Sequence, residues 1–252
     1  MISRLLIQSP EKRARSGWLL AFGDVVTLLI TFFIMVIVLN KTQVSKLQVW
    51  ADQQVSEAYE ELAQQITNQG LQVVSAVRTP QGILLKVQSA AAFNSADYYP
   101  SEQLKEELQY LGILLKQSRL FTLQDSINPQ KRAVLDYAAE EGFYWNSEIV
   151  IEGHTDNDPI QPASPLRNNW FLSAMRAQTV MEELFKASDL PAEQFSISGY
   201  GEHHPVQSND NEIGKEQNRR IEILITAGFV RHLQDAGLPV VAPAPEQVAA
   251  AN

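Results

Sequence analysis

Two groups of residues in this sequence have types and spacings that can do chemistry, and the first depends on one carboxylate. Asp24 is the only charged residue in the apolar run from Trp18 to Leu39. As a helix this run is about 33 Å long, enough to cross the bilayer core, and Asp24 lies about 9 Å into it. A carboxylate there costs roughly 2.5–3.5 kcal/mol, so such residues are rare and are usually functional. We predict that Asp24 carries an ion, either by binding and releasing a proton or by coordinating sodium.

Two hydroxyl side chains share the helix face of this carboxylate. Thr27 and Thr31 follow Asp24 by three and seven residues. They can contribute to an ion path, or they can simply bond to their own helix backbone, as threonines in membrane helices often do. Asp24 can also serve only to pair with a charge on a partner. Since one helix cannot enclose an ion path, the carrier hypothesis requires partner helices.

The second group follows an apolar strand, at a position where loops commonly bind ligands. It begins with Glu152-Gly-His-Thr155-Asp156-Asn-Asp-Pro159. Four residues of the next helix share one face: Asn169, Leu172, Ser173 and Arg176. Asp156 and Arg176 can hold opposite ends of a zwitterion, because a carboxylate suits an ammonium and a guanidinium binds a carboxylate through two hydrogen bonds. A plain salt bridge between them is the alternative.

Composition excludes several other functions. The chain has no cysteine, which rules out disulfides, thiolate metal sites and cysteine nucleophiles. Its net charge of -9 argues against binding nucleic acid, which needs a clustered basic surface. His154, His203 and His204 are too scattered to predict a metal site, and spacing supports neither a Ser-His-Asp triad nor a phosphate loop. We expect no enzymatic activity, no metal and no cofactor beyond a translocated H⁺ or Na⁺.

Charge around the apolar run predicts its orientation. Four basic residues precede the run: Arg4, Lys12, Arg13 and Arg15. Only Glu11 opposes them, so the positive-inside rule places the N-terminus in the cytoplasm and the chain after Asn40 in the periplasm. The run is too long for a cleaved signal peptide and no A-x-A-like site follows it, so we expect it to remain as a single-pass anchor in the inner membrane.

A helical stripe follows the membrane segment. Its apolar residues recur at three- and four-residue steps: Val44, Leu47, Ala51, Val55, Ala58, Leu62 and Ile66. The stripe can pair two copies of the chain, lie on the membrane surface, pack on the domain that follows, or act only as a linker.

The remaining chain alternates between strand and helix patterns. Strands are expected at Leu71–Val77, Ile83–Val87, Glu148–Ile151, Phe195–Ser198 and Arg220–Ile225. Helices are expected at Ser101–Leu115, Asn128–Glu141 and Asn169–Ala187, with a helical turn at Lys215–Arg219, an irregular insertion at 117–128 and a polar loop at 199–213. This pattern predicts an α/β (α+β) sandwich with helices packed on one face of a mixed sheet. The end of the chain, 239–252, is expected to be disordered.

The predicted organisation has five parts. They are a cytoplasmic tail (1–15), a transmembrane helix (16–40), an amphipathic linker helix (41–69), a periplasmic domain (70–228) and a largely disordered C-terminal tail (229–252).

Two sets of motifs resemble known families. The C-terminal half resembles the OmpA-like peptidoglycan-binding domain through Gly153-His-Thr-Asp156, Asn169-x-x-Leu172-Ser173-x-x-Arg176-Ala177, Gly199-Tyr-Gly-Glu202 and Asn218-Arg219-Arg220-Ile-Glu222. The forms Gly-His-Thr-Asp-Asn-Asp-Pro-Ile160 and Asn-Trp-Phe-Leu-Ser resemble the version found in MotB-type flagellar stator proteins. Trp18 with Phe22-Gly-Asp24-Val-Val-Thr27 is similar to the transmembrane signature of that family.

The resemblance implies specific roles. Asp24 matches the ion-carrying aspartate, and Asp156 and Arg176 match the pair that holds diaminopimelate of the peptide stem. Asn169 falls at a supporting position, and Thr155 and Leu172 belong to the same binding motif. The helix at 41–66 lies where the family has a plug against ion leak.

The implied assembly has two copies of this chain inside a ring of a MotA-like partner, expected at five copies. The function implied is coupling of proton or sodium flow to torque on the flagellar rotor during anchorage to peptidoglycan. The alternatives are a related ion-driven unit with a non-flagellar output, such as phage defence or gliding, and a passive peptidoglycan anchor. The identity of the ion and the role of the insertion around 117–147 stay open.

Overall fold

The computed structural model describes residues 10–88, 92–93, 97–161 and 164–231. The chain divides into two compact units, Met1–Leu47 and Gln48–Asn252. The predicted disordered segment 239–252 and most of the predicted tail lie outside the described residues, whereas 229–231 belong to the last strand.

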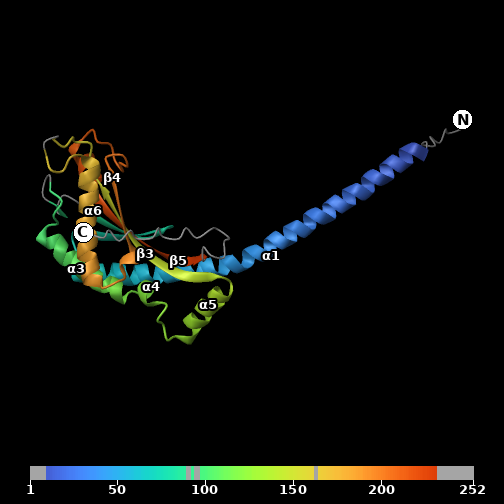
Figure 1. Ribbon diagram of the computed structural model, residues 1–252, viewed down its shortest axis with the longest axis horizontal. Helices are drawn as coiled ribbons and strands as arrows, with labels where there is room; N and C mark the ends of the chain where they lie inside the picture. The colour runs from blue at the N-terminus through green and yellow to red at the C-terminus, as the bar shows by residue number, and fades with distance from the viewer. Residues whose placement is uncertain (1–9, 89–91, 94–96, 162–163, 232–252) are drawn as a thin grey trace, which may run out of the picture. The chain divides into compact units, whose positions relative to one another are not determined.

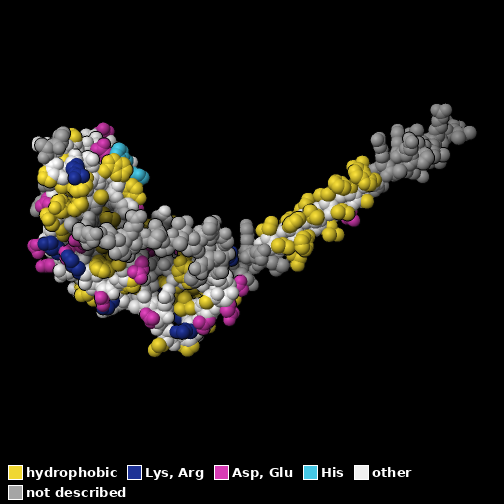
Figure 2. Space-filling model, viewed as in Figure 1, with side chains coloured by type: hydrophobic (Ala, Val, Ile, Leu, Met, Phe, Trp, Pro, Cys, Tyr) yellow, Lys and Arg dark blue, Asp and Glu magenta, His cyan; other side chains and the backbone are white. Residues whose placement is uncertain are grey.

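The first unit contains the beginning of helix α1 (Pro10–Gln69). The helix starts within the expected polar tail, at a proline, which suits the first turn because its missing N–H needs no partner there. It is continuous through residue 40, where two separate helices were expected. Trp18–Val38 is long and apolar enough to cross a membrane, with a mean hydropathy of 2.5, and none of these residues is buried. Hydrophobic side chains cover this part of the helix in Figure 2.

The second unit is built on a five-stranded mixed sheet (Figure 1). Its strands are β1 (Val74–Thr79), β2 (Gly82–Gln88), β3 (Phe143–His154), β4 (Phe195–Gly201) and β5 (Arg220–Arg231), in the order β1-β2-β5-β3-β4. All neighbours are antiparallel except β3 and β4, which are parallel and therefore need a crossover. The predicted fold class is confirmed.

The helices of this unit begin at polar caps. They are α3 (Glu102–Gln117), α4 (Arg119–Thr122), α5 (Pro129–Glu140), α6 (Asn169–Ser188) and α7 (Glu212–Asn218), with a short 3₁₀ turn at Ala192–Gln194. Each α-helix has a Ser or Asn whose side chain accepts a hydrogen bond from a backbone N–H of the first turn: Ser101, Ser118, Asn128, Asn168 and Asn211. The crossover between β3 and β4 is α6.

Strands β3 and β5 are longer than the sequence predicted. They continue to pair beyond Glu148 and Thr226, with Trp145 opposite Phe229. The Trp145 and Phe229 rings lie 5.4 Å apart, and both pack against Trp50 of α1. Contacts between aromatic residues distant in the sequence thus support pairing that local periodicity does not reveal.

Strand β1 starts later along the chain than expected because a buried carboxylate accepts hydrogen bonds from the backbone N–H groups that precede the strand. Glu107 of α3 accepts hydrogen bonds from the N–H groups of Gln72, Val73 and Val74 at 3.0–3.2 Å. These donors serve the carboxylate, and pairing with β2 begins at Val74. The predicted irregular insertion at 117–128 likewise contains a helical turn, α4, capped by Ser118.

The apolar stripe of α1 belongs to the domain core. Five of its residues are buried in one cluster with the sheet, α3 and α6: Ala51, Val55, Ala58, Leu62 and Ile66. Arg119 of α4 forms ion pairs with Glu57 and Glu61, and Arg78 pairs with Asp52. Of the four interpretations of the stripe, packing on the domain is the one that these residues show.

Candidate functional site

Glycines bring α6 against the ends of β3 and β4. A Cβ at Gly153 would overlap the carbonyl oxygen of Ser173, and one at Gly199 would lie 2.6 Å from the backbone nitrogen of Ala174. The Ser173 hydroxyl accepts a hydrogen bond of 3.0 Å from the N–H of Gly201. The absence of side chains therefore lets the first turns of α6 lie directly beside the loop that carries Asp156.

Asp156 is held firmly at the end of β3. It is buried, and its Oδ2 accepts a 2.6 Å hydrogen bond from Nη1 of Arg219, while its Oδ1 accepts one of 3.1 Å from the N–H of Asp158. Thr155 fixes the backbone beside it, donating from its N–H to the Gly201 carbonyl and from its hydroxyl to the Asp156 carbonyl. The carboxylate is thus oriented before any ligand arrives.

Arg219 is a site residue that the sequence prediction missed. It contacts both Asp156 and Glu212. Burial opposes its charge, but hydrogen bonds to these two carboxylates outweigh that effect and raise the pKa of Arg219. Its place in the motif Asn218-Arg219-Arg220 was the available signal, although spacing alone could not connect it to Asp156.

Asn169 clamps the loop at the start of α6. Its Nδ2 lies within hydrogen-bond distance of the Asp156 carbonyl (3.3 Å), the Asp158 carbonyl (3.0 Å) and the Glu202 carboxylate (2.8 Å). Leu172 is buried one turn further along the same helix. Asn169 therefore positions the loop, and its supporting role in peptidoglycan binding stays a prediction.

Arg176 presents a desolvated positive charge. It is buried, donates from Nε to the Asp97 carbonyl at 2.8 Å, and lies over the Phe93 ring at 4.9 Å. Burial lowers the pKa of Arg176 to about 10, and the Asp156 carboxylate acts in the opposite direction. The side chain thus stays charged at neutral pH. Phe93 and Asp97 precede α3, and no spacing rule links them to α6.

Together these residues place the Asp156 carboxylate close enough to the Arg176 guanidinium to act on its pKa, and other groups hold each of the two in position. Asp156 forms an ion pair with Arg219, which anchors the carboxylate. Such an arrangement can receive the ammonium and carboxylate ends of a zwitterion.

The membrane residues lie in the other unit. The Thr27 hydroxyl donates to the carbonyls of Gly23 (3.0 Å) and Asp24 (2.8 Å), and that of Thr31 donates to Leu28 (2.9 Å). Both threonines therefore bond to the backbone of their own helix, which is one of the two roles considered for them from the sequence. A contribution of either threonine to an ion path stays a prediction, as does ion binding by Asp24.

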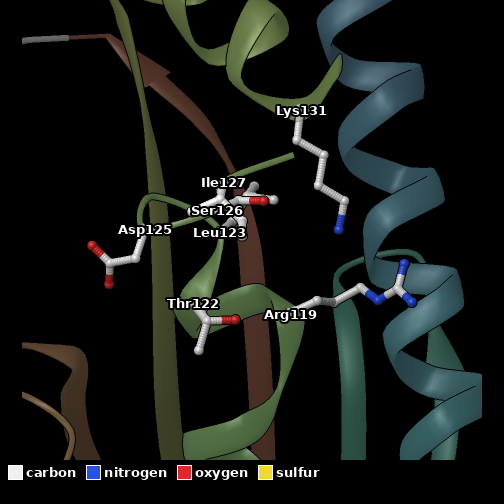
Figure 3. A pocket seen from close by; sticks show the side chains of 7 residues that line it. All are labelled: Arg119, Thr122, Leu123, Asp125, Ser126, Ile127 and Lys131. Atoms are coloured by element: carbon white, nitrogen blue, oxygen red, sulfur yellow. The ribbon is translucent and has the colours of Figure 1, made fainter. Parts of the chain in front are cut away.

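A surface pocket lies elsewhere, in the insertion between α3 and β3. It has a volume of about 280 Å³ and is lined by Arg119, Thr122, Leu123, Asp125, Ser126, Ile127 and Lys131. Figure 3 shows Arg119 pointing toward α1, consistent with its ion pairs to Glu57 and Glu61. The indole of Trp145 also donates to the Leu120 carbonyl at 2.9 Å. The insertion therefore ties α1 to the sheet, and none of the predicted site residues lines its pocket.

Comparison with known proteins gives two family matches. Residues 124–219 match the OmpA family, and residues 7–54 match the family described as membrane MotB of the proton-channel complex MotA/MotB. Motility protein B of Bacillus subtilis (strain 168) is 49% identical over 77 residues, which are 31% of this chain and only 29% of that protein.

Two further proteins are similar over more of the chain. Uncharacterized protein YtxE of Bacillus subtilis (strain 168) is 22% identical over 246 residues, covering 85% of this chain and 90% of that protein. The crystal structure of a MotB-like protein from Desulfovibrio vulgaris superposes with a TM-score of 0.54 at 21% identity, covering 68% of this chain and 90% of that one. At this identity the superposition shows a shared fold.

Proposed function

Because the chain is a MotB-type protein with an OmpA-like domain, we propose that it is the peptidoglycan-anchored subunit of an ion-driven stator. In this proposal α1 crosses the inner membrane once, with its N-terminus in the cytoplasm and the second unit in the periplasm. The unit performs no covalent chemistry. It holds a fixed point on the cell wall against which an ion-driven machine can act.

The observation that carries the wall-binding proposal is the nearness of two buried charges, because the Asp156 carboxylate acts to raise the pKa of the Arg176 guanidinium, on elements joined by direct backbone packing. The side chain of diaminopimelate in the peptide stem ends in an ammonium and a carboxylate, which suit Asp156 and Arg176 respectively. Burial of both protein charges strengthens these contacts relative to water. Arg219 holds the carboxylate in place, and Asn169 and Thr155 hold the backbone that carries it.

The ion-carrying part of the proposal depends on Asp24. Inserting a carboxylate into an apolar span is unfavourable by roughly 2.5–3.5 kcal/mol. The passage of one charge across 100 mV releases about 2.3 kcal/mol, a comparable free energy, so a carboxylate that binds a translocated proton or sodium ion fits an ion-driven function. We propose that two copies of this chain place their Asp24 residues inside a ring of a MotA-like partner. The output is torque on the flagellar rotor. A non-flagellar output, such as phage defence or gliding, would use the same parts.

A plug role for the helix at 41–66 carries a structural requirement. Residues 51–66 contribute buried side chains to the domain core. A plug must therefore use the residues before Ala51, or else this segment must first leave the domain.

Co-sedimentation with purified sacculi tests the wall-binding proposal. The full chain in detergent should pellet with sacculi, and Asp156→Asn or Arg176→Lys should weaken its affinity at least tenfold. The first substitution removes the charge that meets the ammonium, and the second removes the guanidinium geometry that binds a carboxylate through two hydrogen bonds. Asp125→Asn and Arg132→Lys are matched controls on exposed residues of the insertion and should bind normally. Sedimentation of both site variants at the wild-type level would refute this proposal.

Ion flux tests the role of Asp24. In cells that contain the partner subunit, Asp24→Asn should insert normally and bind sacculi normally, but ion flux should be lost. A passive anchor would leave flux and motility unchanged by the substitution, and that result would refute the carrier role while leaving wall binding intact.

A further inference from the structure

A second polar cluster lies on adjacent strands next to the Asp156 loop. Glu152 and His154 are two residues apart on β3, so their side chains share one face of the sheet, and Glu222 of β5 pairs directly with Glu152. One potential ligand atom from each of these three residues lies within 4.8 Å of the other two. Three groups able to bind a cation therefore converge on one point.

The histidine in this cluster is buried without a hydrogen-bond partner. His154 is only 3% exposed, and neither Nδ1 nor Nε2 bonds to any described residue. One face of its ring stacks on Tyr200 at 5.2 Å between centroids. Buried polar atoms are nearly always satisfied in folded proteins, so an unpartnered imidazole aimed at two carboxylates indicates a missing ligand.

We propose that Glu152, His154 and Glu222 bind a divalent transition-metal ion, with Zn²⁺ the best match. Zinc accepts imidazole nitrogen and carboxylate oxygen at about 2.0–2.2 Å, and tetrahedral geometry puts such ligand atoms about 3.4 Å apart. The three ligand atoms lie within 4.8 Å of one another, so the proposal requires the glutamate side chains to move closer when the ion binds. Water completes the coordination.

The surrounding groups suit this role. Tyr200 donates to one oxygen of Glu152 at 3.3 Å, and Arg220 donates to one oxygen of Glu222 at 2.7 Å. In each glutamate the second oxygen has no hydrogen-bond partner among the described residues. Such outer contacts orient metal ligands. Two carboxylates against one guanidinium leave the cluster net negative, which favours a cation.

Burial, reinforced by the nearby charge of Arg220, lowers the pKa of His154 to about 4. The imidazole is therefore neutral at physiological pH, the form that binds metals. Lys86, across from Glu222 on β2, is exposed and adds only a solvent-screened positive charge.

Metal binding by the full chain tests the proposal. Tag-free protein in detergent is stripped with EDTA and dialysed against Zn²⁺, and bound zinc is measured by mass spectrometry. We expect one ion per chain and a raised thermal midpoint. Glu152→Gln and Glu222→Gln should each weaken affinity at least tenfold, and Tyr200→Phe about tenfold.

His203→Gln is the matched control. His203 packs against the Trp170 ring outside the cluster, so the substitution should leave the zinc affinity unchanged. Variants of buried His154 can fail to fold, so the test uses the conservative Glu→Gln variants. Their unfolding transitions, measured without zinc, verify that these Glu→Gln variants are folded. Absence of zinc binding by the wild type, or equal zinc binding by the Glu152→Gln/Glu222→Gln double variant, would overturn the proposal.

Discussion

Leu62→Ala tests whether the stripe of α1 is part of the domain in solution. Leu62 is 8% exposed and belongs to the core cluster shared with the sheet and α3. The substitution deletes three carbons, which at about 0.8 kcal/mol per buried CH₂ amounts to about 2.4 kcal/mol, and a residual cavity adds to this. Alanine favours helix at least as well as leucine, so helix propensity does not contribute to the loss.

For a domain of this size, a loss of about 2.4 kcal/mol lowers the thermal midpoint by about 5–10 °C. The assay is thermal or urea unfolding of the full chain in detergent, followed by the fluorescence of the tryptophans. Glu60→Ala, on the exposed side of the same helix, is the control and should change the free energy of unfolding by less than about 0.5 kcal/mol. If both variants unfold at the wild-type midpoint, the segment is not packed on the domain.

Two further predictions concern the frame of the site and its neighbouring cluster. Gly153→Ala should lower the free energy of unfolding in urea by about 3 kcal/mol, because the added methyl group would overlap the Ser173 backbone. Gly228→Ala is the control and should be nearly neutral, since the space around Gly228 is open. Equal unfolding midpoints for the two variants would contradict the close packing at Gly153. In the presence of EDTA, the free energy of unfolding should fall by at most about 3 kcal/mol as the pH drops from about 6.5 toward 4. In this range His154 binds a proton in the unfolded chain, whereas its burial keeps it neutral in the folded chain. Urea unfolding at a series of pH values measures this slope, and His154→Gln should flatten it; a slope that is the same in both proteins would show that other groups cause it.

The sequence was sufficient for the fold class because its apolar patterns are local. The isoleucines of β3 and β5 alternate, and α6 has a clear helical face, so these elements were recognised and the fold class is confirmed. Their boundaries were less accurate. Pairing of Trp145 with Phe229 extends β3 and β5, and the Glu107 carboxylate shifts the start of β1 to a later residue. Both effects come from contacts between segments far apart in the chain.

The grouping of the proposed site residues was predictable where they belong to neighbouring motifs, and residues that tertiary packing adds to the group were missed. Thr155, Asp156 and Asn169 are brought together by the approach of α6 to β3. Arg219 and Asp97 come from distant segments, and nothing in their spacing indicates a contact with Asp156 or Arg176. The expectation of no metal site considered the histidines alone, whereas strand pairing brings two carboxylates to His154.

The most direct test of the central claim is the affinity of the full chain for two muropeptides that differ only in the third residue of the stem. With meso-diaminopimelate the side chain ends in both an ammonium and a carboxylate, whereas with lysine the carboxylate for Arg176 is missing. Isothermal titration calorimetry should show at least tenfold tighter binding of the diaminopimelate form, since a buried charged hydrogen bond is worth about 1.5–3 kcal/mol. Equal affinity for the two muropeptides would contradict the assignment of Asp156 and Arg176 as the zwitterion-binding pair.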